Sequence, residues 1–486
     1  MEDKLGTTRT PIILLMGLCI LTGCSGDPSP SQEGPVQPAS GSMAGYYEIT
    51  LDPTSLGLAP EAIDRVTVGG VAAYSLVAQD DGLLRLTIQG HPQPGEAEII
   101  VHSGEESYVL ESPFRYNPPL SAHFDRFVAI GASLTQGVQR GTPSYHGALM
   151  SPSAQIARQA RAYHPLPLLK PGLFPQVDVE DIGDPPICAI PNVVSFVVAS
   201  FAEILPKLSD PETDVPGYQF ARIDPDITVY NIAVGSSMVS ATLHGPGDDI
   251  GASFLGHLVY EPYGAFLSPV EQSQMDVLES LEPTLVISTD LLGNDIIWGI
   301  VAEDEINPDL STSLEEIHAD LILLLDRLAA TGAQAFLATL PRPSMLPVTE
   351  TKRAQMLADG FTDVDERIDA IDALATAANA LLVEESARHD NIHVVEIAAR
   401  VLELETTGLQ VGDEILTTHL FGGLLGLDGI HFTDTGYGLL ANGFIEAIND
   451  TLGTDIPFVD LVEILAHDPE SPTAIQEKGL DPSQCE

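Results

Sequence analysis

The sequence predicts two folded domains in a chain of 486 residues, a small all-β sandwich followed by a larger α/β domain. Two patterns predict this architecture. Between residues 45 and 118, short segments of alternating apolar residues are separated by turn-forming residues, which is typical of antiparallel sheets. From residue 122 to about 466, apolar strands alternate with amphipathic helices, which favours a parallel sheet covered by helices on both faces.

The strands expected in the first domain are at 65–68, 84–88, 97–101 and 114–116. Gly- and Pro-containing turns separate them, at 69–70, 80–82 and 93–95. The Val-Thr-Val-Gly-Gly stretch and the closing Phe-Arg-Tyr-Asn-Pro resemble the IPT/TIG immunoglobulin-like domains of bacterial surface proteins, over this segment alone. That resemblance implies an immunoglobulin-like sandwich, in which no group of catalytic residues is visible.

In the second domain, strands are expected at 124–130, 227–233, 284–290, 335–340 and 392–397. Helices are expected between and after them, at 152–162, 268–281, 313–330, 364–388 and 435–452. A long proline-rich insertion at 137–225 contains a very apolar stretch, 193–205, which is interpreted as a core helix in preference to a lid. Functional side chains of such domains lie at the carboxyl ends of the strands.

The first 23 residues have the pattern of a secretory leader, with Lys4 and Arg9 before a short apolar run. The run ends in Leu-Thr-Gly-Cys24, which resembles the lipobox of bacterial lipoproteins and implies cleavage before Cys24 and a lipid on its thiol. An ordinary signal peptide or a buried helix is the alternative. Residues 24–44 are rich in Pro, Gly and Ser and are predicted to be a flexible spacer. We therefore expect an exported cell-envelope lipoprotein, at the periplasmic face or outer surface, held to the membrane by its lipid.

The formal net charge of −50 argues against nucleic acid as a partner, because phosphates would be repelled. Solubility in a saline habitat is the favoured explanation, ahead of recognition of a cationic partner. Outside the leader and the lipidation site, only Cys188 and Cys485 are left to pair. A disulfide between them would join the insertion to the polar C-terminal tail, 467–486, and two free thiols are equally compatible with the sequence.

The predicted chemistry rests on a serine near the start of the second domain and a histidine near its end. Ser133 follows the first strand in the segment Gly-Ala-Ser-Leu, where a helix N-cap is the alternative role. His431 lies before the final helix, and Asp428 precedes it by three residues. That spacing lets the carboxylate hold one ring nitrogen while the other faces a serine hydroxyl. The combination predicts nucleophilic catalysis by a hydroxyl group.

A further segment is predicted to supply a donor for an oxyanion. Asn294 follows the strand at 284–290 and can donate its side-chain amide, although a turn-forming Asn beside Gly is the alternative.

Together these segments resemble the conserved blocks of the GDSL, or SGNH, hydrolases, in the family's order and across residues 122 to about 454. The resemblance implies a flavodoxin-like three-layer α/β/α fold, with Ser133 as nucleophile, His431 as base, Asp428 as its orienter, and no metal or cofactor. The sequence departs from the family at three positions: Ala132 replaces the usual Asp, Leu292 replaces a glycine, and Ser236 stands where the oxyanion glycine belongs, one position after Gly235. The second oxyanion donor that the resemblance implies is the backbone N–H of either Gly235 or Ser236, in the segment after the strand at 227–233.

The family resemblance implies hydrolysis of carboxylic esters through an acyl-serine. Segments 153–159 and 421–429 resemble those of secreted bacterial lipases and esterases, which favours acyl lipids or small esters over acetylated glycans. A carbohydrate O-acetyl esterase is the nearest alternative. An alternative of another class is a non-catalytic surface adhesion lipoprotein, in which the hydrolase domain is inert and the sandwich binds a partner.

Overall fold

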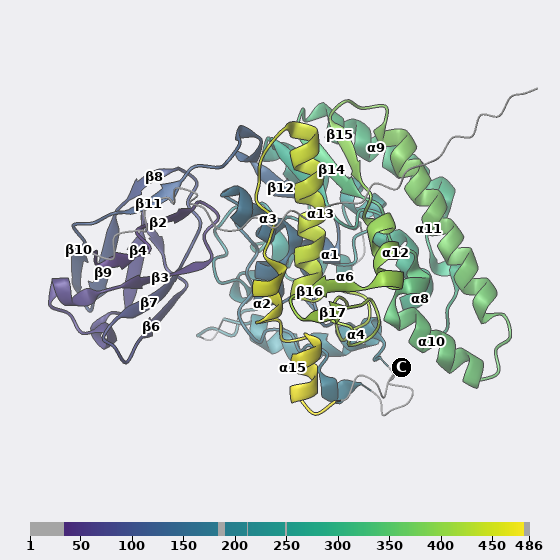
Figure 1. Ribbon diagram of the computed structural model, residues 1–486, viewed down its shortest axis with the longest axis horizontal. Helices are drawn as coiled ribbons and strands as arrows, with labels where there is room; N and C mark the ends of the chain where they lie inside the picture. The colour runs from purple at the N-terminus through teal and green to yellow at the C-terminus, as the bar shows by residue number, and fades with distance from the viewer. Residues whose placement is uncertain (1–33, 183–189, 211, 248–249, 481–486) are drawn as a thin grey trace, which may run out of the picture.

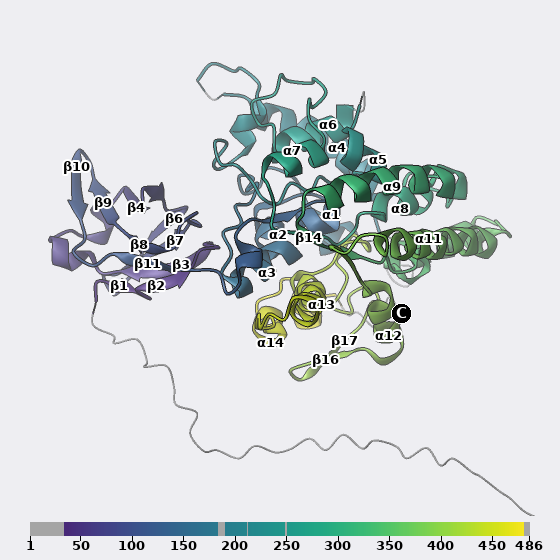
Figure 2. The same ribbon diagram turned by 90° about the horizontal axis from the view of Figure 1, so that it is seen from above.

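The computed structural model describes residues 34–182, 190–210, 212–247 and 250–480 (Figure 1). They form a mixed α/β structure, with antiparallel sheets in the N-terminal region and a parallel sheet further along the chain (Figures 1 and 2). The expected leader, Cys24, Cys188 and Cys485 lie outside the described residues, so lipidation and the disulfide stay predictions.

The N-terminal region, residues 36–117, holds eleven described strands in three small sheets. The sheet orders are β1-β3-β7-β6, β10-β9-β4-β5 and β2-β11-β8, and only the β2–β11 pair is parallel. The strands are β1 (Val36–Gln37), β2 (Ser40–Ser42), β3 (Tyr47–Leu51), β4 (Arg65–Val68), β5 (Val71–Ala72), β6 (Ser75–Ala78), β7 (Leu84–Ile88), β8 (Gly95–Ala97), β9 (Ile99–Ser103), β10 (Glu106–Val109) and β11 (Phe114–Asn117).

Two predictions for this region need correction. Part of the expected spacer is ordered, because β1 and β2 pair with later strands and the side chains of Val36 and Met43 are buried in the core. A few apolar residues among Pro, Gly and Ser are enough to extend a sheet that already exists. The single strand expected at 97–101 is interrupted at Glu98, so that β8 and β9 join different sheets.

The parallel sheet has the order β12 (Phe127–Ala129), β13 (Leu285–Ser288), β14 (Gln334–Ala338) and β15 (Ile392–Val395). Its central strands are apolar on both faces, as expected for a sheet with two covered sides. In β14, Phe336 and Ala338 belong to one core cluster, whereas Ala335 and Leu337 belong to the other. The sheet therefore separates two apolar cores.

The strand expected at 227–233 is not a regular strand. The segment pairs with β12 through a single parallel bridge between Ala129 and Asn231, supported by hydrogen bonds such as Ile232 N–H to the Ala129 carbonyl at 2.9 Å. This segment therefore lies on one side of β12, and β13, which comes later in the chain, lies on the other. The order of strands in the sheet thus reverses direction at β12. Such a reversal opens a crevice at the carboxyl end of the strands, and Ser133 lies there.

Helices cover both faces of the sheet, and in Figure 2 β14 lies between the two sets. One face carries α5 (Val239–His244), α6 (Ile250–Val259), α7 (Gln274–Ser280), α8 (Gly293–Val301), α9 (Leu314–Ala330) and α11 (Val364–Ser386), and the other carries α3 (Pro152–Ala160), α12 (Ile397–Thr407) and α13 (Asp434–Leu452). The remaining elements are α1 (Ser133–Gln136), α2 (Tyr145–Met150), α4 (Val193–Ile204), α10 (Pro347–Ala358), α14 (Leu461–Leu465), α15 (Pro472–Glu477) and the hairpin β16 (Leu409–Val411) and β17 (Glu414–Leu416).

The helix expected at 268–281 begins only at Gln274, because Ser273 caps it by accepting from the N–H of Asp276. The expected polar tail also needs correction, since its described part packs onto the domain: Ile475 in α15 is fully buried, and Glu470 accepts from the N–H of Leu427 at 2.8 Å. Among the described residues, no helix combines the length and apolarity needed to cross a membrane.

Candidate active site

Ser133 sits at a sharp turn between β12 and the four-residue helix α1. The turn needs glycine at position 131, where φ is +130° and a Cβ atom would lie 2.5 Å from Ser288 Oγ. Ser133 is partly exposed, and its hydroxyl has no hydrogen-bond partner among the described residues. The local sequence therefore places a hydroxyl at the carboxyl edge of the sheet without a structural role for it.

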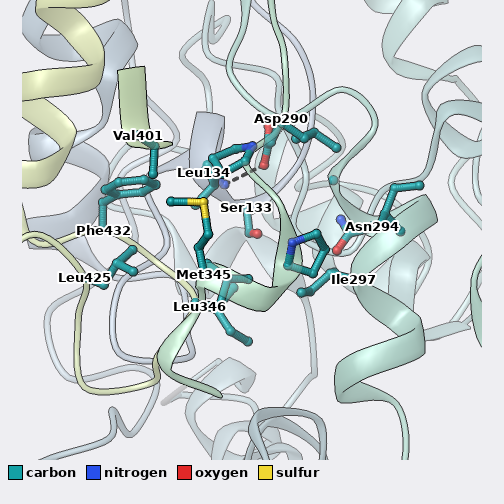
Figure 3. A pocket seen from close by; sticks show the side chains of 16 residues that line it. Ser133, Leu134, Asp290, Asn294, Ile297, Met345, Leu346, Val401, Leu425 and Phe432 are labelled. Carbon is teal, nitrogen blue, oxygen red and sulfur yellow. Dashed lines mark hydrogen bonds between the residues drawn. The ribbon is translucent and has the colours of Figure 1, made fainter. Parts of the chain in front are cut away.

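Asp290, directly after β13, holds the backbone on both sides of Ser133 (Figure 3). Its carboxylate accepts from the N–H of Ala132 at 3.0 Å and from the N–H of Leu134 at 2.7 Å. Thr135 Oγ1 donates to it as well, at 2.7 Å. The N–H of Ser133, between the two clamped groups, has no acceptor in the described part of the chain. These contacts leave the backbone N–H of Ser133 free beside its own hydroxyl group.

Asp290 belongs to the candidate site, and it was not predicted from the sequence. Burial raises the pKa of its carboxyl, while the hydrogen bonds from Thr135 and the backbone oppose that rise. A carboxylate at the end of an otherwise apolar strand was the available signal, because such a group must find donors when buried. Its donors come from a segment more than 150 positions earlier, which is why periodicity alone did not reveal its role.

His431 and Asp428 make the contact that their spacing predicts. His431 Nδ1 lies 2.7 Å from Asp428 Oδ2, and the two side chains are almost completely buried. Burial opposes ionisation of Asp428, but the His431 ring and the N–H groups of His431 and Ile430 outweigh it and hold its pKa below the usual range. Gly141, in the long insertion, also donates its N–H to this carboxylate. The imidazole is therefore fixed with Nε2 as its remaining nitrogen.

The loop that carries His431 ends where α13 begins. Thr433 caps this helix by accepting from the N–H of Gly436 at 3.1 Å. Behind the loop, Asp434 accepts from Gln139 Nε2 at 2.8 Å and pairs with His146 Nε2 at 2.7 Å. These contacts join the start of α13 to the segment that follows α1.

Asn294, near the start of α8, is oriented by one hydrogen bond from Nδ2 to the carbonyl of Ser237 at 2.9 Å. This contact uses one of its two amide protons. The neighbouring Asp295 accepts from the N–H of Val239 at 2.9 Å, and burial raises the pKa of Asp295 to about 6. Asp295 therefore ties the segment that contains Gly235 and Ser236 to the segment that contains Asn294.

The structure separates the two residues proposed for the second backbone donor. Gly235 donates its N–H to Gln136 Oε1 at 2.9 Å, so that group is occupied. Ser236 is exposed with φ of +67°, and its N–H has no acceptor among the residues described. A Cβ atom at position 235 would lie 4.0 Å from Ser133 Cβ, so the segment passes close to Ser133. This geometry favours Ser236 over Gly235.

Two pockets meet at Ser133. The small pocket has a volume of about 90 Å³, and thirteen of its sixteen lining residues are apolar (Figure 3). The large pocket has a volume of about 390 Å³, and its lining includes His431, Ser236 and Gln136. Four residues line both pockets: Ser133, Asn294, Ile297 and Ile430. The large pocket falls in the size range of small-molecule sites, about 300–1,000 Å³.

The described residues contain no group of three or more His, Cys, Asp or Glu side chains arranged to hold a metal ion. No protein-family model matches this chain, and no curated protein matches its sequence significantly.

Proposed function

We propose that this protein is a serine hydrolase of the SGNH type that cleaves carboxylic esters through an acyl-serine intermediate. The observation that carries the proposal is one pocket lined by both an unpartnered Ser133 hydroxyl and a histidine that Asp428 holds at 2.7 Å. A weak nucleophile, a base and an orienting carboxylate are the three parts that hydroxyl catalysis needs.

In the proposed mechanism, His431 Nε2 takes the proton of the Ser133 hydroxyl as Oγ bonds to the ester carbonyl carbon. The oxyanion accepts from the N–H of Ser133, the N–H of Ser236 and the amide of Asn294. The carbonyl reforms as the bond to the alcohol oxygen breaks, and His431 gives its proton to that oxygen. Water then attacks the acyl-serine, with His431 as its base, and releases the acid and the Ser133 hydroxyl.

The finer architectural assignments belong to the same proposal. The order of segment 229–234, β12, β13, β14 and β15 is what a flavodoxin-like three-layer domain would have. The eleven N-terminal strands are compatible with an immunoglobulin-like module of the IPT/TIG kind. We also propose that the protein is exported and anchored through lipid on Cys24, on the lipobox resemblance alone.

The lining of the pockets supports an apolar ester as substrate. Among the described residues, the small pocket is lined by three polar residues, Ser133, Asp290 and Asn294, and the large pocket by no Asp, Glu, Lys or Arg. A sugar would present several hydroxyl groups, which need polar partners when they are buried. Acyl lipids or small esters therefore fit better than an acetylated glycan.

The proposal is tested by measuring hydrolysis of aryl esters by the wild-type protein and by Ser133→Ala. We expect kcat to fall by about 10⁴-fold or more, because the other groups cannot replace the nucleophile. Ser280→Ala, which removes an exposed hydroxyl on α7, is the matched control and should keep full activity. Equal rates for wild-type protein and Ser133→Ala would refute the proposed nucleophile.

A further inference from the structure

We infer that the two pockets divide the ester between them, with a short acyl group in the small pocket and the alcohol portion in the large one. This inference rests on the proposed function, since it concerns how the same site holds its substrate. It narrows the substrates of the proposed function to esters of short-chain acids with a larger alcohol, and it excludes lipids whose cleaved acyl chain is long.

The position of His431 decides which pocket receives the alcohol. The leaving oxygen must lie within hydrogen-bond reach of the imidazole that protonates it. His431 lines the large pocket and is not part of the lining of the small one. The alcohol portion therefore extends into the large pocket, and the acyl chain extends from the same carbonyl carbon in the other direction.

The small pocket lies where an acyl chain would extend. In Figure 3, Ser133 is near the centre, with Asn294 and Ile297 on one side and Val401, Leu425 and Phe432 on the other. Asn294 is a proposed oxyanion donor, so the carbonyl oxygen points toward it, leaving the opposite wall for the chain. That wall is apolar and almost fully buried, with Val401 5%, Leu425 3% and Phe432 5% exposed.

The size of the small pocket limits the acyl group. At about 90 Å³ it is smaller than the apolar cavity of about 150 Å³ that holds benzene in an engineered protein. Among the described residues of its lining, Asp290 is the one with a charged side chain, and its oxygens are occupied by backbone N–H groups. The pocket thus accepts a few methylene groups and offers no partner to a polar chain.

The test measures kcat/KM over two substrate series: p-nitrophenyl esters from acetyl to octanoyl, and butanoate esters of alcohols of increasing size. The wild-type protein should prefer acyl groups shorter than octanoyl. Val401→Trp fills the small pocket and should lower hexanoyl turnover relative to acetyl turnover by at least about 10-fold, the discrimination usual for one methylene group. Val401→Ala enlarges the pocket and should shift the preference toward longer chains, even if the tryptophan variant does not fold.

Ala241→Trp fills the large pocket and should lower turnover of bulky alcohol esters while leaving the order of acyl preference unchanged. Leu404→Trp is the matched control for Val401, because Leu404 is a buried residue of α12 that lines neither pocket. Its acyl preference should be that of the wild type.

Two results would overturn the assignment of the acyl group to the small pocket. In one, both Val401 variants keep the wild-type acyl preference; in the other, Ala241→Trp shifts the preference toward shorter acyl chains. A different outcome separates this inference from the function on which it rests. If folded wild-type protein hydrolyses no ester in either series, the proposed function itself is wrong, and the division of the pockets falls with it.

Discussion

The core of the N-terminal β region is almost entirely apolar, whereas the α/β region buries seven of its described carboxylates. In the β region the buried polar side chains are Thr67 and Gln89. The buried carboxylates of the α/β region are Asp290, Asp295, Glu385, Asp428, Asp434, Asp468 and Glu470. Burying a carboxylate costs free energy unless several donors satisfy it, so these groups are not what packing alone would favour.

Two of these seven buried carboxylates hold parts of the candidate site in place. Asp290 fixes the backbone around Ser133, and Asp428 fixes the ring of His431. In the β region, by contrast, paired strands pack over a core of apolar side chains, and no described carboxylate is buried there. The comparison indicates that the proposed chemistry depends on the region that buries carboxylates. Substitutions in the two regions should therefore have different effects.

The largest effect is expected for Asp428→Asn. The amide keeps the size of the side chain but cannot stabilise an imidazolium, and it favours the wrong histidine tautomer, so kcat should fall by about 10⁴-fold. Steady-state kinetics on a short-chain aryl ester would measure it. Asp326→Asn, which removes the exposed partner of His389 at 3.5 Å, is the control. An equal fall in kcat in the two variants would mean that Asp428 does not orient the catalytic histidine.

Asn294→Ala should lower kcat by about 100- to 1,000-fold, because one oxyanion donor is removed while the nucleophile and base remain. KM should change far less than kcat, since the interaction strengthens only in the transition state. Asn307→Ala, outside both pockets, should have wild-type kinetics. A loss confined to KM would show that Asn294 binds substrate without stabilising the oxyanion.

Leu86→Ala tests the other side of the comparison. Leu86 lies in β7 and is fully buried, so its truncation should destabilise the β region by about 2–5 kcal/mol. Below the unfolding transition, kcat/KM for a short-chain ester should stay at the wild-type value. Urea unfolding followed in parallel with ester turnover would check both statements. A large loss of turnover in folded protein would show that the β region contributes to the site.

The smallest effect concerns the dependence of stability on pH. Burial, with help from Asp468, raises the pKa of Glu470 to about 8 from 4.5. Because the folded-state pKa is the higher one, the stabilisation is complete below pH 4.5 and is lost as the pH rises through about 8. Glu470→Gln keeps an acceptor for the N–H of Leu427 and removes this titration.

The free energy of unfolding of wild-type protein should therefore fall as the pH rises from 5 to 9, and that of Glu470→Gln should not show this fall. The difference, variant minus wild type, should rise by about 1–3 kcal/mol over this range. Urea unfolding at the two pH values would measure the difference, with the exposed Glu463→Gln as control. If the free energy of unfolding changed with pH by the same amount in wild type and Glu470→Gln, Glu470 would be ionised at neutral pH in the folded protein.

Much of this organisation could be predicted from the sequence. The change from period-two segments to alternating strands and helices predicted antiparallel sheets followed by a parallel sheet. The spacing of Asp428 and His431 predicted their contact, because three residues in a tight loop bring the two side chains together. Such predictions depend on neighbours in the sequence, for which local geometry is nearly sufficient.

What could not be predicted depends on contacts between distant segments. The role of Asp290 requires β12 and β13 to be adjacent, and the choice of Ser236 over Gly235 requires the Gln136 side chain to reach Gly235. The small pocket likewise combines Met345 after β14, Val401 in α12 and Phe432 beside His431. No periodicity in the sequence brings these three residues together.

The central claim is that Ser133 is an activated nucleophile, and covalent labelling tests it most directly. Folded protein is treated with a fluorophosphonate, which reacts with activated serine hydroxyl groups, and the modified peptide is identified by mass spectrometry. We predict one adduct on Ser133 that is absent from Ser133→Ala and strongly slowed in Asp428→Asn. No adduct on folded wild-type protein, or equal labelling of Ser133→Ala, would contradict the proposed active site.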